Sequence, residues 1–216
     1  MNINIAKEGL RFIISGLVLS CIFIILSVYV ESNWIKIAAI LFLSFTGFCL
    51  NFFRDPHREI PEGDNILISS ADGKVVKVEE IDSDEHGEKA ILVSVFLSVF
   101  NVHANRIPFS GTVKSVNHIN GKFLAAFDHK ASDENERSIT VYDTNHGKII
   151  LKQIAGLIAR RILNYSKIGD SVKSGDRMGF IMFGSRTDII FPTVFDVKVK
   201  EGQRVIGGET IIAEAK

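Results

Sequence analysis

The sequence has few of the residues that stabilise small secreted proteins or bind metal ions. It contains two cysteines in 216 residues, Cys21 and Cys49, and both lie in apolar segments, which excludes a disulfide framework and a cysteine-based metal cluster. The six histidines are scattered, and no pair has the spacing of zinc ligands. Lysine plus arginine and aspartate plus glutamate number 25 each, so bulk charge does not favour nucleic acid as a partner.

Long apolar runs are present, and they gather near the N-terminus. Residues 12–30 contain no charge, and residues 34–53 contain only Lys36. Each run has about the 20 residues that a helix needs to cross a bilayer. Basic residues flank the pair on both outer sides: Lys7, Arg11, Arg54 and Arg58. We therefore predict that residues 1–58 form a membrane-associated helical hairpin with both termini in the cytoplasm.

This hairpin has alternatives that the sequence leaves open. The first run could be a signal peptide, but no A-x-A-like site follows it and a second apolar run does. Residues 18–21 weakly resemble a lipoprotein cleavage site. The hairpin could also dip into one leaflet without crossing, and the pattern does not separate dipping from spanning.

From residue 59 to residue 216 the pattern changes to short runs rich in Val, Ile and Phe, separated by turns that contain glycine. Such runs are typical of strands and hairpins. A repeat of the form G-x-x-V-x-x-G-[DE] occurs at 169–176 and again at 202–209. It resembles the hairpins of lipoyl and biotinyl carrier folds, which place a reactive group on an exposed hairpin. We predict a mainly β fold: an antiparallel, barrel-sandwich-like domain behind the N-terminal helical hairpin.

The peptide between Gly184 and Ser185 lies between the two copies of the repeat. Gly184 has no side chain, so its carbonyl is open to attack, and the Ser185 hydroxyl is the nearest nucleophile. If the fold strains this peptide, the hydroxyl captures the carbonyl as an ester, and elimination leaves a dehydroalanine that hydrolyses to a pyruvoyl group. A pyruvoyl carbonyl forms a Schiff base with an amine and accepts electrons. A Gly-Ser pair is also typical of an ordinary hairpin turn.

Two further residues are candidates for this chemistry. His103 follows a strongly apolar run and is a natural base to deprotonate Ser185 near neutral pH. Asp72, in an Ala-Asp-Gly segment, could orient the imidazole in an Asp–His–Ser arrangement. The spacing does not establish that these three residues meet. The plain alternatives are a turn for Asp-Gly and a buried strand-end residue for His103.

Several motifs occur in one order along nearly the whole chain: FRDPHR (53–58), IP (60–61), ADG (71–73), NVHANR (101–106), QIAG (153–156), ARRI (159–162), GFI (179–181) and FGSR (183–186). Together they resemble the phosphatidylserine decarboxylase family, in its short bacterial and archaeal type. Three positions depart from the longer type of this family. Arg106 stands at the position of a second histidine, and Phe183 and Arg186 flank Gly-Ser where the longer type has Leu and Thr.

The resemblance implies a proenzyme that cleaves itself between Gly184 and Ser185 into chains 1–184 and 185–216, which stay associated as a heterodimer. Ser185 would become a covalent pyruvoyl group, and no metal would be required. The enzyme would convert phosphatidylserine to phosphatidylethanolamine and CO2 on the cytoplasmic side of the inner membrane, in phospholipid biosynthesis. The resemblance also assigns catalytic roles to His103 and Asp72. It leaves open whether His103 serves cleavage, decarboxylation or both.

The lipid head group calls for a cationic partner, and four arginines are candidates: Arg106, Arg160, Arg161 and Arg186. Two other classes of function also remain. A membrane-bound carrier or adaptor would need a lysine at the hairpin tip, where this chain has Gly184 and Ser185. A Ser–His–Asp hydrolase would need a G-x-S-x-G elbow, which residues 183–187 do not supply.

Overall fold

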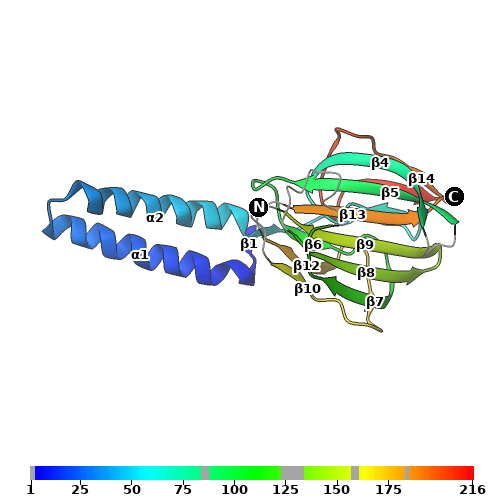
Figure 1. Cartoon of the computed structure of the whole chain (residues 1–216), viewed down its shortest axis with the longest axis horizontal. Helices are drawn as coiled ribbons and strands as arrows, with labels where there is room; N and C mark the ends of the chain where they lie inside the picture. The colour runs from blue at the N-terminus through cyan, green and yellow to red at the C-terminus, as the bar shows by residue number, and fades with distance from the viewer. Residues whose placement is uncertain (1–2, 84–87, 123–133, 157–160, 183–184) are drawn as a thin grey trace. The chain divides into compact units, whose positions relative to one another are not determined.

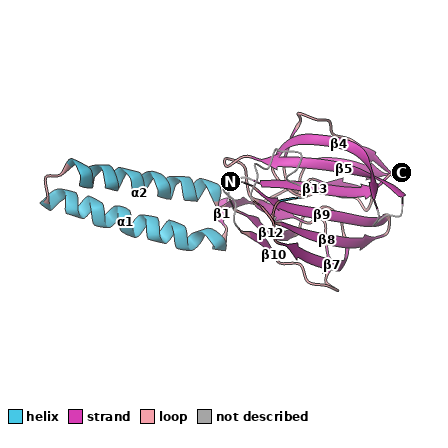
Figure 2. Cartoon of the chain, viewed as in Figure 1, coloured by secondary structure: helices cyan, strands magenta, loops and turns pink. Residues whose placement is uncertain are grey.

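The computed structural model describes residues 3–83, 88–122, 134–156, 161–182 and 185–216. The chain divides into two compact units, Met1–His57 and Arg58–Lys216. Within the described residues, the long helices belong to the first unit and the second unit is built of strands (Figure 1, Figure 2). The assignment of a membrane role to one part and a catalytic role to the other stays a prediction.

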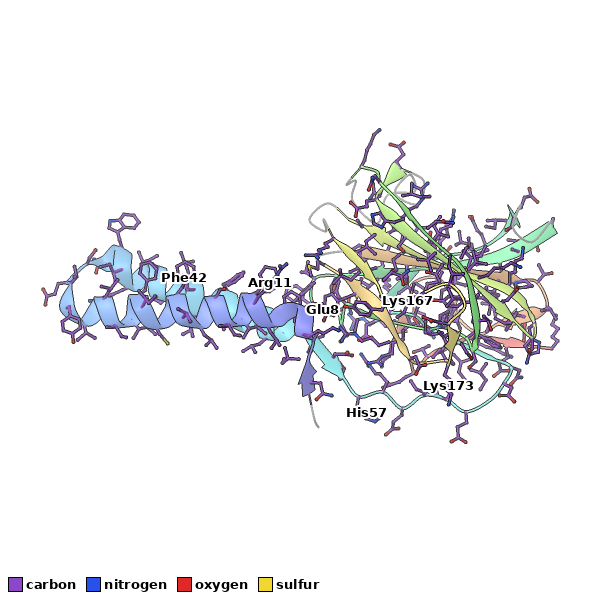
Figure 3. The ribbon with its side chains drawn as sticks, turned by 90° about the horizontal axis from the view of Figure 1, so that it is seen from below. Glu8, Arg11, Phe42, His57, Lys167 and Lys173 are labelled. Carbon is purple, nitrogen blue, oxygen red and sulfur yellow. The ribbon has the colours of Figure 1, made fainter. Side chains whose placement is uncertain are left out.

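The first unit is a helical pair with a small two-stranded sheet at its base. Its elements are β1 (Ile3–Ile5), a 3-10 turn (Lys7–Gly9), α1 (Leu10–Tyr29), α2 (Asn33–Phe52) and β2 (Arg54–Pro56), with β1 antiparallel to β2. Figure 3 labels Glu8 and Arg11 near the end of the pair at which α1 begins.

The two helices pack closely through small residues and aromatic rings. A Cβ atom added at Gly16 would lie 2.4 Å from the Thr46 hydroxyl, so glycine allows the helices to approach each other there. The rings of Phe23 and Phe42 stack with centroids 5.3 Å apart. Much of the outer apolar surface is exposed, including Trp34 at 80 %. By length and composition, both helices could associate with a membrane, which would cover this surface.

In its described residues, the second unit holds three antiparallel sheets. The largest has the strand order β11-β7-β8-β9-β13-β5-β4-β15, and the two smaller ones have the orders β10-β12-β6 and β14-β16-β3. Their bounds are β3 (Ile66–Ile68), β4 (Gly73–Ser83), β5 (Glu88–Leu97), β6 (Ala104–Arg106), β7 (Gly111–Ile119), β8 (Arg137–Thr144), β9 (Gly147–Ala155), β10 (Ile162–Asn164), β11 (Ser171–Val172), β12 (Arg177–Ile181), β13 (Ser185–Pro192), β14 (Phe195–Val197), β15 (Arg204–Val205) and β16 (Ile211–Ala215). The predicted mainly β, antiparallel fold is confirmed, with the large sheet curled into a half-barrel.

The two copies of the sequence repeat form the two edge strands of the large sheet. The first copy contains β11, which pairs with β7 at one edge, and the second contains β15, which pairs with β4 at the other. In both copies the two glycines have positive φ angles of 87–89°, which side chains other than glycine rarely adopt. The repeat therefore marks paired glycine turns around a two-residue edge strand.

The core lies against one face of the large sheet, where alternate residues of its strands point. Val95, Leu151 and Phe191 are fully buried on this face. They belong to one cluster with Leu67 of β3 and Ile212 of β16, so the large sheet packs on the β14-β16-β3 sheet. The rigid core fixes the position of β13, which runs through the middle of the large sheet and begins with Ser185.

Candidate active site

Ser185 is the first residue of β13, and it is fully buried between two strands. It pairs with Leu97 at the end of β5 and with Ala155 at the end of β9. Its hydroxyl has no hydrogen-bond partner among the described residues. A buried hydroxyl without a partner is costly for stability alone, so it points to a chemical role. Ser185 differs from the reactive group of a carrier in not being exposed, because it lies inside the sheet. Gly184 lies outside the described residues.

The antiparallel order of the sheet brings several chain segments to the end of the sheet at which β13 begins with Ser185 (Figure 1). β5 and β9 end beside Ser185, while β4 begins at this same end, just after Asp72. Asp72 therefore directly precedes β4, which is two strands away from β13, a backbone separation of about 10 Å. The topology thus gathers the segments that carry candidate residues at one end of the sheet.

His103 is fully buried just after the turn that follows β5. That turn is fixed by Asn101, whose side-chain carbonyl accepts bonds from the backbone N–H (2.9 Å) and the hydroxyl (2.7 Å) of Ser98. The His103 Nδ1 lies 3.0 Å from the backbone carbonyl oxygen of Asn101. Since a carbonyl only accepts, Nδ1 carries a proton, and in the neutral ring the lone pair is on Nε2. This tautomer leaves Nε2 as the atom that can take up and deliver a proton.

The backbone of His103 is tied to the strand that leads to the Gly-Ser peptide. The Ile181 N–H at the end of β12 donates to the His103 carbonyl at 3.2 Å. Four residues later the chain reaches Ser185 in the large sheet. The backbone of His103 is thus hydrogen-bonded to the chain four residues before Ser185. Among the described residues, however, no hydrogen bond joins the His103 ring to the Ser185 hydroxyl.

Asp72 is held by a different set of groups. Its two carboxylate oxygens accept bonds of 2.8 and 2.9 Å from one guanidinium nitrogen of Arg58, and Oδ1 accepts a further bond of 2.8 Å from the Gly207 N–H. The side chains of Arg58 and Asp72 are 10 % and 16 % exposed, so the pair is largely shielded from water. Asp72 makes no hydrogen bond to His103 or Ser185 within the described part of the chain. Among the described residues, hydrogen bonds therefore do not link Asp72, His103 and Ser185 into a relay.

We expect the Arg58→Met substitution to lower the free energy of unfolding by about 1–3 kcal/mol, because it leaves a largely buried carboxylate without its cation. Urea denaturation of the purified protein would measure this. The matched control is Lys198→Met, which removes a more exposed pair with Asp196 and should leave the urea midpoint unchanged. Equal midpoints for Arg58→Met and wild type would show that the Arg58–Asp72 pair does not stabilise this end of the sheet.

A buried amide pair beside the site was not predicted from the sequence. The Gln153 Nε2 donates to the Asn105 Oδ1 at 2.8 Å and weakly to the Leu163 carbonyl at 3.4 Å. Gln153 pairs with Thr187 across the β9–β13 ladder, on the same face as Ser185. The available signal was a single amide in the run 149–155, which is apolar apart from Lys152 and Gln153, because a buried polar residue in such a strand normally has a partner.

The four candidate arginines have different surroundings. Arg186 is buried and bound to Asp188 and Ser94, so its guanidinium does not face an incoming head group. Arg106 donates to the Gly175 carbonyl at 3.3 Å. Arg161 is exposed, and Arg160 lies outside the described residues. In the described ranges, no group of three or more His, Cys, Asp or Glu residues is arranged to hold a metal ion.

Comparison with known proteins places these features in a family. Residues 45–213 match the family model described as phosphatidylserine decarboxylase. The chain is similar to the phosphatidylserine decarboxylase proenzyme of Wolbachia pipientis wMel, with 47 % identity over 97 % of this chain and 90 % of that protein. Proteins of the same name from Ehrlichia canis and Chlorobaculum tepidum are 43 % and 39 % identical, over 99 % and 98 % of this chain and 92 % and 98 % of their own lengths.

Proposed function

Given that this chain belongs to the phosphatidylserine decarboxylase family and is a decarboxylase of phospholipid synthesis, we propose that it matures by cleaving itself between Gly184 and Ser185. The smaller product, residues 185–216, would begin with a pyruvoyl group made from Ser185. The observation that carries this proposal is the fully buried Ser185 hydroxyl at the start of a central strand, which has no partner in the part of the chain that the structure describes.

The chemistry of maturation balances within the chain and one water molecule. The Ser185 hydroxyl attacks the Gly184 carbonyl, and the peptide bond becomes an ester. Loss of the Ser185 α-proton breaks the ester C–O bond, which releases Gly184 as a carboxylate and leaves dehydroalanine at residue 185. Water then replaces the nitrogen, which leaves as ammonia. The buried hydroxyl suits the first step because no competing hydrogen bond within the described residues has to be broken.

A pyruvoyl group at residue 185 would supply an electrophilic carbonyl for the substrate amine and an electron sink for the decarboxylation. The chain's own residues would provide the rest. His103 would hold a proton at Nε2 and deliver it after CO2 has left, since its Nδ1 is occupied by the Asn101 carbonyl. Asp72, fixed by Arg58 and Gly207, would keep a negative charge at the rim of the site.

The strand order supports a heterodimer that survives the cut. Three strands of the smaller product pair with strands of the larger one: β13 lies between β5 and β9, β15 pairs with β4, and β16 pairs with β3. Residues 185–216 are therefore interleaved with residues 1–184 by backbone hydrogen bonds, and many of their apolar side chains share one core. Such a small chain cannot leave without breaking the large sheet.

The membrane part of the proposal concerns the substrate, which is a two-chain lipid. The apolar surface of α1 and α2 would lie in the inner membrane, and residues 59–216 would work on its cytoplasmic side. This would keep the catalytic residues close to the plane of the phosphatidylserine head groups.

Intact mass spectrometry of the purified wild-type protein tests the proposal. We expect two chains split between Gly184 and Ser185, with a pyruvoyl mass at the start of the smaller one. Incubation with phosphatidylserine and cyanoborohydride should add the mass of the bound amine lipid less one oxygen atom to the smaller chain alone, because condensation releases water and reduction adds two hydrogens. A folded, uncut chain of 24.0 kDa that still decarboxylates phosphatidylserine would overturn the pyruvoyl mechanism.

A further inference from the structure

Self-cleavage creates a mechanical problem at residue 185. Before the cut, this residue is held by covalent bonds on both sides, whereas afterwards it is the first residue of a chain. Chain ends fray unless side chains or backbone bonds tie them down. A reactive group at such an end needs a fixed position, because a displacement of about 1 Å costs up to roughly 100-fold in rate.

Arg186, the next residue, has the contacts to solve this problem. Its Nε donates to the Asp188 Oδ1 at 2.6 Å, and a terminal guanidinium nitrogen donates to the Asp188 Oδ2 at 3.2 Å and to the Ser94 hydroxyl at 2.7 Å. The side chains of Arg186 and Asp188 are 4 % and 1 % exposed. The guanidinium thus links the start of β13 to Ser94 in the middle of β5.

This ion pair lies on the opposite face of the sheet from Ser185. Successive residues of a strand point to opposite faces, so Ser185 and Thr187 share the core face while Arg186 and Asp188 share the other. The pair therefore does not take part in substrate contacts through the Ser185 face. Burying two charges costs free energy, and a pair of apolar residues would often be at least as stable. Stability alone does not account for a buried arginine at this position.

We propose that Arg186 is a positioning residue that holds the N-terminal end of the smaller chain in register after self-cleavage. The proposal rests on the function proposed above. The fork of Arg186 on Asp188 and Ser94 takes over the constraint that the broken peptide bond provided. Its effect is consequently larger on decarboxylation by the mature enzyme than on the cleavage itself, since the uncut chain already holds residue 185 from both sides.

The test compares Arg186→Lys with wild type in the full-length membrane protein. Lysine keeps the charge but cannot bridge both partners as a planar fork does. We expect cleavage to remain near the wild-type extent, kcat for phosphatidylserine to fall roughly 10- to 100-fold, and KM to change less than about threefold. Ser94→Ala, which removes one of the bonds, should show the same pattern with a smaller loss of kcat.

Hydrogen exchange gives a readout that general destabilisation would not move. In cleaved Arg186→Lys, the amides of residues 186–189 should exchange at least about tenfold faster than in wild type. In the uncleavable Ser185→Ala background, the same substitution should leave these amides protected. The matched control is Ile190→Val, which makes a small change in an apolar cluster on the same strand and the same face as Arg186. This variant should keep both kcat and protection.

The outcomes separate the two proposals. If wild type is not cleaved, the proposed function fails and the positioning role falls with it. If wild type is cleaved and active but Arg186→Lys keeps its kcat and its protection, only the positioning role is overturned. A loss of cleavage as large as the loss of kcat would also overturn it. Should Arg186→Lys not accumulate as a folded protein, Ser94→Ala carries the same comparison.

Discussion

Replacement of Ser185 by alanine should leave a single chain of 24.0 kDa with no decarboxylase activity. Alanine has no hydroxyl to attack the Gly184 carbonyl, so neither the cut nor the pyruvoyl group can form. Because that group would carry the whole reaction, the activity should fall by at least about 10⁶-fold, to the background rate. Intact mass spectrometry and release of CO2 from phosphatidylserine measure the two effects on the same sample.

Thr187→Val is the matched control for this experiment. Thr187 lies two residues further along β13, on the same face, and its buried hydroxyl also has no hydrogen-bond partner among the described residues. Valine has nearly the same shape, so this variant should still be cut. Cleavage of Ser185→Ala would exclude Ser185 as the nucleophile. Loss of cleavage in both variants would attribute the effect to the packing of β13 rather than to the Ser185 hydroxyl.

The parts of the fold that follow from local patterns could be predicted from the sequence. The two long apolar runs predicted the helices, which begin at Leu10 and Asn33, because apolar length and a near-absence of charge are local properties. The sequence predicted short strands separated by glycine-containing turns, and the turns of the repeat lie at both edges of the large sheet. The motifs led to the family, which the comparison with known proteins confirms.

The contacts that define the site could not be predicted in this way. Asp72 binds Arg58 and Gly207, and the latter is 135 residues away in the sequence. Neither periodicity nor turn chemistry carries information about such distant partners. A relay from Asp72 to His103 was a chemically reasonable pairing, and among the described residues no hydrogen bond joins these two side chains. The burial of Ser185 was missed for a related reason: a Gly-Ser pair is typical of exposed turns, and only the strand order places it in the middle of a sheet.

The His103→Gln substitution should separate decarboxylation from cleavage. Glutamine can replace a hydrogen bond but cannot transfer a proton near neutral pH, so kcat for phosphatidylserine should fall about 10²- to 10⁴-fold. Cleavage should persist, because the Ser185 hydroxyl has no hydrogen bond to His103 in the uncut chain, so the imidazole is not placed to deprotonate it. Mass spectrometry of the variant would then show two chains in an almost inactive enzyme.

The control for this substitution is His118→Gln, which changes a half-exposed histidine of β7 that contacts Glu136 and should leave both reactions intact. Two results would contradict the role assigned to His103. An uncut His103→Gln chain would make the imidazole a base for Ser185, with Nε2 taking up the hydroxyl proton. A cut chain with wild-type kcat would mean that the proton reaches the product carbon from another donor. The Nδ1 bond to the Asn101 backbone carbonyl is kept in either role, because it leaves Nε2 as the nitrogen that exchanges a proton.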